Sequence, residues 1–253
     1  MDKKELQNPA LYTNRELSWL LFNKRVLSEA RDKQLLLFER LKFLSITASN
    51  LDEFFMVRIG SLVDMIHAEY TKKDIAGMSA KEQLDALMEE THKFAALQYS
   101  TYNRMLLPQL RANGLNFVEH HEQLTERQAQ YVDEYFEENV YPVLTPMAVD
   151  SSRPFPLIRN KTLNIGALVA KKGEKDTEIE FATVQVPSVL PRVVRIPAAK
   201  EGDTEVAVLL LEEIIERNIS KLFLNYNVLC AHPFRITRNA DLAIDEDEAE
   251  DLL

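Results

Sequence analysis

Five histidines are the residues of this sequence best suited to acid–base, nucleophilic or metal chemistry. None of them has metal-ligand spacing, and none lies beside a serine or cysteine in a nucleophile motif. We therefore interpret each as a surface or hydrogen-bonded core residue, and we predict neither catalytic residues nor metal ligands in this chain. The five are His67, His92, His120, His121 and His232.

The segment SNLDEF, residues 49–54, offers a different chemistry. The Asn50 carboxamide carries one acceptor and two donor hydrogens, which complements the edge of adenine, where a ring nitrogen accepts beside an amino group that donates. From the residues alone, a helix cap is the favoured interpretation, with Ser49 or Asn50 at the cap and Glu53 completing a capping box. Asp52 and Glu53 do not form a general acid–base pair, because neighbouring residues of a helix point about 100° apart.

A loose group of cations lies in residues 153–175. A phosphate chain is a polyanion, for which such groups are suitable partners. The sequence RPFP at the start of this group suits an interdomain or dimer contact equally well, because Pro154 and Pro156 fix the backbone. The cations are Arg153, Arg159, Lys161, Lys171, Lys172 and Lys175.

Charge argues against a nucleic-acid partner. The net charge is −10, and most of it comes from residues 239–253, which hold acids but no lysine or arginine. The chain has no basic stripe of the kind that nucleic-acid binders carry, so we expect no nucleic acid among its partners.

The sequence also lacks the segments that direct a protein to or through a membrane. Its longest purely apolar run, Val206–Leu211, is far shorter than a membrane span. The N-terminus has no signal-peptide pattern. The single cysteine, Cys230, lies in an apolar context and predicts a buried, inert thiol. We expect a soluble, cytoplasmic protein.

The first 110 residues have the pattern of an all-helical module. Apolar residues recur with helical spacing from Asn14, the predicted N-cap, to about Asp32. A second helix begins near Leu35 and breaks at the less helical residues 47–50, and a third continues to about residue 70. A capping box at Ser79 opens a long helix that ends near residues 108–114.

Residues 111–253 read as a mixed α/β module. A capping box at Thr125 opens a helix to about Val140. Strands are predicted at residues 163–170, 181–186, 192–196 and 228–236, with helical spacing over 208–223. The fold class is therefore α+β, a helical bundle followed by an α/β domain. The acids from Asp245 onward suggest the first turn of a further helix, so we expect the natural protein to continue beyond Leu253.

Four stretches spread along the chain resemble the polyphosphate kinase family. They begin at Asn14 (NRELSWLLFNKRVLSEA), Glu39 (ERLKFLSITASNLDEFFMVRIGSL), Arg153 (RPFPLIRNKTLNI) and Phe234 (FRITRNADLAIDEDEAEDLL). The stretch VPSVLPRVVRIP from Val186 also fits. Their order and spacing make the resemblance much more specific than any single short motif.

The resemblance implies an enzyme that moves the terminal phosphate between ATP and polyphosphate through a phosphorylated histidine. Residues 1–110 would be its helical N-terminal domain, and 111–253 its head domain, truncated at the C-terminal end. The catalytic domains, which supply the phosphorylated histidine, the arginines and the Mg²⁺ ligands, have no counterpart here. The fragment alone is therefore expected to be inactive.

The resemblance also assigns site residues and partners. In the family, the asparagine at the position of Asn50 reaches the nucleotide, and an aromatic residue matched by Phe43 packs near the base. The implied ligands are ATP or ADP and polyphosphate, with Mg²⁺ that has no ligands in this chain, and the implied assembly is a homo-oligomer. The alternative is a non-catalytic helical scaffold or protein-interaction module.

Overall fold

The computed structural model describes residues 5–149, 158–173 and 179–239. These residues form two compact units. One contains the described residues up to Gln109 together with 237–239, and the other is Leu110–Ile236. Arg153, Lys175, the RPFP sequence and the helix start at Asp245, all singled out in the sequence, lie outside the described residues.

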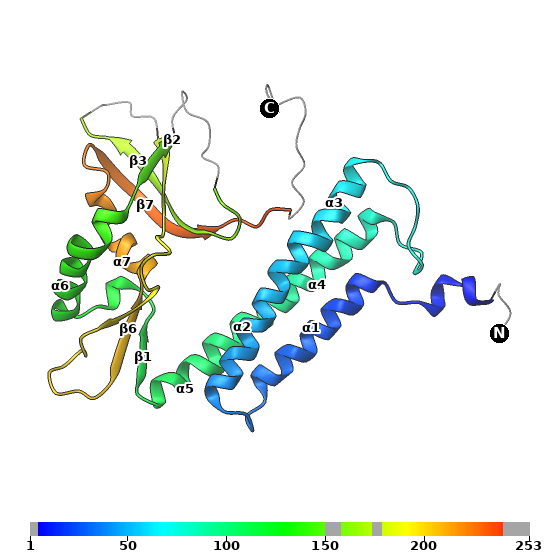
Figure 1. Cartoon of the computed structure of the whole chain (residues 1–253), viewed down its shortest axis with the longest axis horizontal. Helices are drawn as coiled ribbons and strands as arrows, with labels where there is room; N and C mark the ends of the chain where they lie inside the picture. Colours follow the sequence, from blue (N-terminus) through cyan, green and yellow to red (C-terminus); the bar gives the residue numbers. More distant parts are fainter. Residues whose placement is uncertain (1–4, 150–157, 174–178, 240–253) are drawn as a thin grey trace. The chain divides into compact units, whose positions relative to one another are not determined.

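The first unit is a bundle of helices (Figure 1). Helix α1 packs against α2 and α4, and α3 packs against α4. A π-helical turn, Phe55–Ile59, joins α2 to α3, and a second, Tyr102–Leu106, joins α4 to α5. The helices are α1 (Arg15–Arg31), α2 (Leu37–Phe54), α3 (Gly60–His67), α4 (Ala80–Thr101) and α5 (Leu107–Ala112).

Three of the predicted helix caps are confirmed, those at Asn14, Ser79 and Thr125. The Asn14 side chain accepts hydrogen bonds from the backbone N–H groups of Glu16 and Leu17, at 3.0 and 2.9 Å, and so begins α1. Ser79 forms a reciprocal capping box with Glu82 at the start of α4. In the second unit, Thr125 forms the same box with Gln128 and begins α6 (Glu126–Tyr135). These local signals place the helix starts correctly because each satisfies backbone donors that the helix leaves unpaired.

The predicted break at residues 47–50 is wrong, because α2 runs through it without interruption. Thr47 is fully buried, and its hydroxyl donates to the Leu44 carbonyl at 2.7 Å within the helix. Packing of this segment outweighs the weak helix propensity of its residues. Asn50 therefore lies in the last part of α2 and caps no helix, which overturns the capping interpretation of Ser49 and Asn50.

The second unit contains two sheets. In the first, β1 (Leu115–Val118) pairs in parallel with β6 (Val206–Leu210), which pairs antiparallel with β5 (Val193–Ile196). The second sheet is antiparallel in the order β2-β4-β3-β7. Helix α6 and the short α7 (Leu211–Arg217) contribute to the shared core. The strands of the second sheet are β2 (Pro146–Val149), β3 (Leu163–Lys171), β4 (Ile179–Gln185) and β7 (Tyr226–Arg235).

The strand predictions are confirmed for β3, β4, β5 and β7, but three strands were missed. The sequence predicts helical spacing over residues 208–223, but residues 208–210 belong to the strand β6. A short apolar run such as VAVLL has no period that separates a strand from a helix, and β6 is a central strand with buried residues. The four-residue strands β1 and β2 were also not predicted.

Cys230 is exposed, so the prediction of a buried thiol is wrong. It lies on β7, at the edge of the antiparallel sheet, opposite Leu168 of β3. Leu168 is itself 39% exposed, and both residues lie on the solvent side of the sheet. An edge strand with one open face leaves apolar residues such as these in water.

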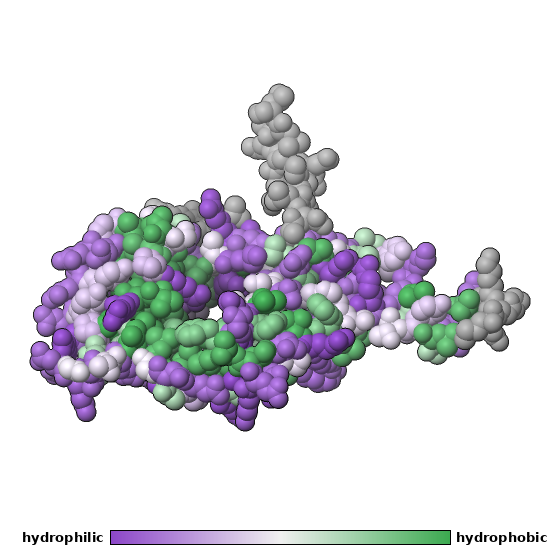
Figure 2. Space-filling view, turned by 60° about the horizontal axis from the view of Figure 1, so that its bottom comes forward, coloured by the Kyte–Doolittle hydropathy of each residue, from purple (hydrophilic) through white to green (hydrophobic). Residues whose placement is uncertain are grey.

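Apolar side chains reach the surface elsewhere too, and they appear as green areas among hydrophilic purple in Figure 2. The exposed apolar side chains of the chain include Leu36, Phe38 and Leu229. Among the described residues, no helix is long and apolar enough to cross a membrane.

Candidate functional site

A small pocket on the helical unit has Asn50 on its wall. Helix α1 contributes Trp19 and Phe22, while α2 and the π-helical turn after it contribute the other residues. The pocket has a volume of about 220 Å³. Its lining residues are Trp19, Phe22, Asn50, Glu53, Phe54, Val57 and Arg58.

Aromatic side chains form one side of this pocket. Trp19 stacks on Phe54 with ring centroids 4.5 Å apart and an angle of 9° between the rings. Phe54 is buried, but Trp19 is only half-buried and Phe22 is 55% exposed. Phe54 belongs to the buried core, Trp19 packs against that core while half-buried, and Phe22 lies at the surface. Trp19 and Phe22 therefore present partly exposed rings to the pocket, and Trp19 stacks on the buried Phe54.

A buried hydrogen-bond network orients the Asn50 carboxamide. Asn50 Nδ2 donates to Asn23 Oδ1 at 3.1 Å, and Asn23 Nδ2 donates to the Thr47 carbonyl at 3.1 Å. Asn23 is fully buried. The Thr47 carbonyl can only accept a hydrogen bond, so the Asn23 amide nitrogen must face it and the Asn23 oxygen must face Asn50. The group that Asn50 directs at this oxygen must then be its amide nitrogen, which donates.

This orientation leaves a mixed polar edge on Asn50. Within the described chain its carboxamide makes one hydrogen bond, so Oδ1 and the second amide hydrogen remain available. The side chain is half-buried and lines the pocket. An acceptor and a donor side by side can pair with a partner that presents the reverse pattern.

The structure does not bring Phe43 to this pocket. Phe43 is half-buried and packs against a separate cluster formed by Leu27, Ala30 and Phe94. It precedes Asn50 by seven residues on α2, so it lies on the same side of the helix but roughly 10 Å away. Trp19 and Phe22 are instead the aromatic residues beside Asn50. Trp19 and Phe22 are three residues apart on α1, which predicts that they share one face of the helix. The sequence does not predict which other helix packs beside that face.

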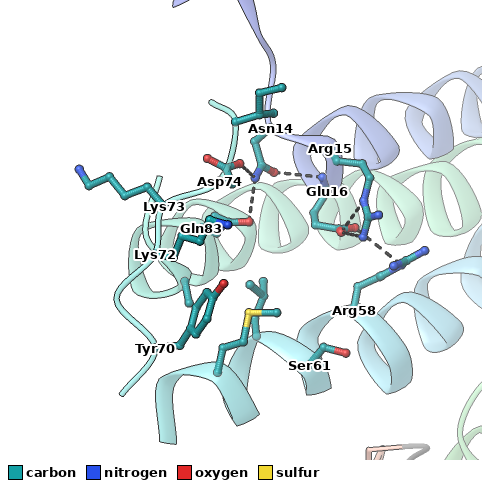
Figure 3. A pocket seen from close by; sticks show the side chains of 14 residues that line it. Asn14, Arg15, Glu16, Arg58, Ser61, Tyr70, Lys72, Lys73, Asp74 and Gln83 are labelled. Carbon is teal, nitrogen blue, oxygen red and sulfur yellow. Dashed lines mark hydrogen bonds and ion pairs between the residues drawn. The ribbon is translucent and has the colours of Figure 1, made fainter. Parts of the chain in front are cut away.

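A second pocket of about 280 Å³ shares Arg58 with the first (Figure 3). Its lining residues include the cations Arg15, Arg58, Lys72 and Lys73 and the acids Glu16 and Asp74. Positive groups therefore outnumber negative ones. The guanidinium groups of Arg15 and Arg58 both approach the buried Glu16 carboxylate, at 2.6 and 3.9 Å. The longer distance leaves Arg58 loosely held.

The other end of this second pocket is held by Asn14. Besides capping α1, its Nδ2 donates to Asp74 Oδ2 and to Gln83 Oε1, both at 2.8 Å (Figure 3). These contacts join the start of α1 to the segment before α4 and to α4 itself. Asn14 is therefore a structural residue of the pocket wall.

The cations between residues 159 and 172 do not form one patch. Arg159 and Lys161 precede β3, while Lys171 and Lys172 are at its far end, roughly 26 Å away along the strand. Lys172 Nζ donates to the Leu224 carbonyl at 2.9 Å, and Lys171 lies 3.8 Å from Glu180. The described cations of this group therefore cannot bind one short anion together.

Family models cover both units of the chain. The polyphosphate kinase N-terminal domain matches residues 12–118, and the polyphosphate kinase middle domain matches residues 127–253, half of the chain. The chain belongs to the polyphosphate kinase family. This confirms the resemblance found in the sequence, and the Asn50 pocket lies within the part that matches the N-terminal domain.

Individual polyphosphate kinases show the same relationship. The chain is 48% identical to the polyphosphate kinase of Lactiplantibacillus plantarum over 242 residues, which are 96% of this chain and 33% of that protein. It is 47% identical to that of Halalkalibacterium halodurans over 250 residues, 98% of this chain and 35% of that protein. The chain thus spans about a third of the length of the curated relatives it matches.

The fold is also that of a polyphosphate kinase. The crystal structure of the enzyme from Porphyromonas gingivalis matches with a TM-score of 0.79 and 31% sequence identity, over 92% of this chain and 34% of that one. The predicted α+β class, a helical unit followed by a mixed unit, is confirmed.

Proposed function

We propose that this chain is part of a polyphosphate kinase that reversibly transfers the terminal phosphate of ATP to polyphosphate, and that the Asn50 pocket holds the adenine base. Family membership supports the reaction class. The phosphorylated histidine and the Mg²⁺ ligands belong to the part of the enzyme outside this chain. The proposal includes a cytoplasmic homo-oligomer with ATP, ADP and polyphosphate as its ligands.

The orientation of Asn50 is the observation that carries the adenine assignment. The bond to Asn23 uses one amide hydrogen and leaves Oδ1 and the second amide hydrogen available to a ligand. The edge of adenine presents an amino donor beside a ring-nitrogen acceptor, which is the reverse pattern. The scaffold alternative does not call for a carboxamide held in a fixed orientation beside exposed aromatic rings.

The aromatic side of the pocket suits a flat base. Trp19 and Phe22 offer exposed ring area next to Asn50, and bases stack on such rings with about 1–3 kcal/mol each. A volume of about 220 Å³ is smaller than the roughly 300–1,000 Å³ of complete small-molecule sites. The pocket therefore fits one end of a nucleotide, and the remainder must contact other residues.

Arg58 is the cation best placed for that remainder. It lies on the wall that the two pockets share, and its guanidinium is 3.9 Å from the Glu16 carboxylate. A guanidinium is suited to bidentate contact with a phosphate. In this proposal Arg58 exchanges its loose contact with Glu16 for an oxygen of the nucleotide.

The test is Asn50→Ala in a full-length enzyme that carries this chain. Loss of one or two hydrogen bonds to adenine, at about 0.5 to 1.5 kcal/mol each, should raise the KM for ATP by roughly 2- to 100-fold. Steady-state kinetics at saturating polyphosphate measure this change, and the kcat should change less than the KM.

Thr47→Val is the matched control. It removes a buried hydroxyl that accepts from Gln98 Nε2 at 2.9 Å and donates to the Leu44 carbonyl. The Thr47 carbonyl that accepts from Asn23 stays in place, and Thr47 does not line the pocket. We expect lower stability and an unchanged KM for ATP. If both variants raise the KM alike, Asn50 acts through the stability of the bundle and the adenine assignment fails.

A further inference from the structure

A hollow in the second unit gathers three of the five histidines. Its volume is about 510 Å³. Three glutamates line it with them, and no lysine or arginine is among the described residues that line it. The lining residues are His120, His121, Glu122, Gln123, Glu213, Glu216, His232 and Pro233.

The topology of the first sheet explains why these residues meet. Strands β1 and β6 are parallel neighbours, with Val118 opposite Leu209 near their carboxyl ends. The segment 120–122 follows β1, and Glu213 lies in the first turn of α7, which follows β6 directly. The crevice at the carboxyl ends of parallel strands is the common place for ligands in α/β sheets.

Three side chains bring possible ligand atoms close to the separations that a metal ion requires. One atom each from His120, Glu122 and Glu213 lies within 4.8 Å of the other two. His120 Nδ1 is 3.8 Å from Glu213 Oε1. Tetrahedral Zn²⁺ with bonds of about 2.0–2.2 Å needs its ligand atoms roughly 3.3–3.6 Å apart. The side chains of His120 and Glu122 are 67% and 72% exposed, so small rotations can close this difference.

His121 holds Glu213 in the required orientation. Its backbone N–H donates to Glu213 Oε2 at 3.0 Å, and its ring Nδ1 lies 3.3 Å from the same oxygen. The other carboxylate oxygen, Oε1, is the one directed at His120. Metal-binding carboxylates are usually held by such secondary hydrogen bonds.

The charges around the hollow also favour a cation. Glu216 lines the hollow together with Glu122 and Glu213 and lies 3.4 Å from His232 Nδ1. Carboxylates crowded together without a lysine or arginine on the hollow wall gain from a bound positive ion.

From this geometry we infer that His120, Glu122 and Glu213 bind one divalent transition-metal ion of the Zn²⁺ class, with water completing its coordination. An imidazole together with carboxylates favours Zn²⁺ over Mg²⁺, which prefers oxygen ligands alone. His121 is a positioning residue for Glu213. This inference does not depend on the function proposed above.

The test is titration of the metal-free 253-residue chain with ZnCl₂ by calorimetry. We expect one Zn²⁺ per chain, and weakening by at least about 10-fold in Glu122→Gln and in Glu213→Gln. Glu122 is exposed, so its variant folds normally even if Glu213→Gln does not. The visible spectrum of bound Co²⁺ should show a four- or five-coordinate ion that disappears in His120→Ala.

Two histidines of the helical unit supply the control. His67→Ala and His92→Ala should bind Zn²⁺ like the unmodified chain. The inference is overturned if no Zn²⁺ binds, if Glu122→Gln binds it as tightly as the unmodified chain, or if Mg²⁺ binds with equal affinity.

Discussion

Because Asn50 donates a hydrogen bond to Asn23, a substitution at position 50 affects the stability of the protein as well as the pocket. An aspartate there would place a carboxylate oxygen against Asn23 Oδ1, so that two acceptors face each other. Turning the Asn23 amide over would relieve this contact but would break its bond to the Thr47 carbonyl. Either arrangement leaves a polar atom without a partner around the fully buried Asn23.

Asn50→Asp should therefore lower stability as well as weaken nucleotide use. We expect a loss of about 1–3 kcal/mol in the free energy of unfolding, because a buried acceptor or donor loses its partner. Urea unfolding of the 253-residue chain measures this loss. The exposed Asn225 provides a matched control, and Asn225→Asp should leave stability within about 0.5 kcal/mol. Equal stability of the two variants would argue that the Asn23–Asn50 bond contributes nothing.

At the scale of elements, the start of α1 depends on one side chain with two tasks. Asn14 is 3% exposed; its oxygen caps the helix and its nitrogen reaches Asp74 and Gln83. Asn14→Ala should cost about 1 kcal/mol for the cap and about 1–3 kcal/mol more for the partners left without a donor. Thermal unfolding followed by circular dichroism measures the sum.

Asn8→Ala is the control for this prediction. Asn8 caps a short exposed 3₁₀ helix in the same way, accepting from the Ala10 N–H at 3.1 Å, but has no partner comparable to Gln83 in the described chain. Its replacement should shift the melting temperature little. A loss in Asn14→Ala no larger than that in Asn8→Ala would show that the contacts to Asp74 and Gln83 are not stabilising.

At the scale of the whole molecule, the proposed function predicts no turnover by this chain alone. Incubated with ATP and Mg²⁺, it should make no polyphosphate, and with polyphosphate and ADP it should make no ATP. The reason is that the proposed phosphorylated histidine lies outside these residues. Labelled γ-phosphate retained on any of the five histidines of the chain would contradict this assignment.

The sequence by itself determined the features that depend on near neighbours along the chain. The caps at Asn14, Ser79 and Thr125 involve residues two or three positions apart, so their patterns are visible in the letters. The division into a helical and a mixed part follows from periodicity over ten to twenty residues. The family resemblance likewise rests on continuous stretches.

Only the tertiary structure decided what surrounds the candidate sites. Packing kept α2 helical through residues 47–50, and brought Asn23 to Asn50 and Trp19 to Phe54 from another helix. The parallel pairing of β1 and β6 brought Glu213 to His121, 92 positions away. These contacts depend on which faces of distant elements are buried against each other, and local propensity and spacing carry no information about that choice.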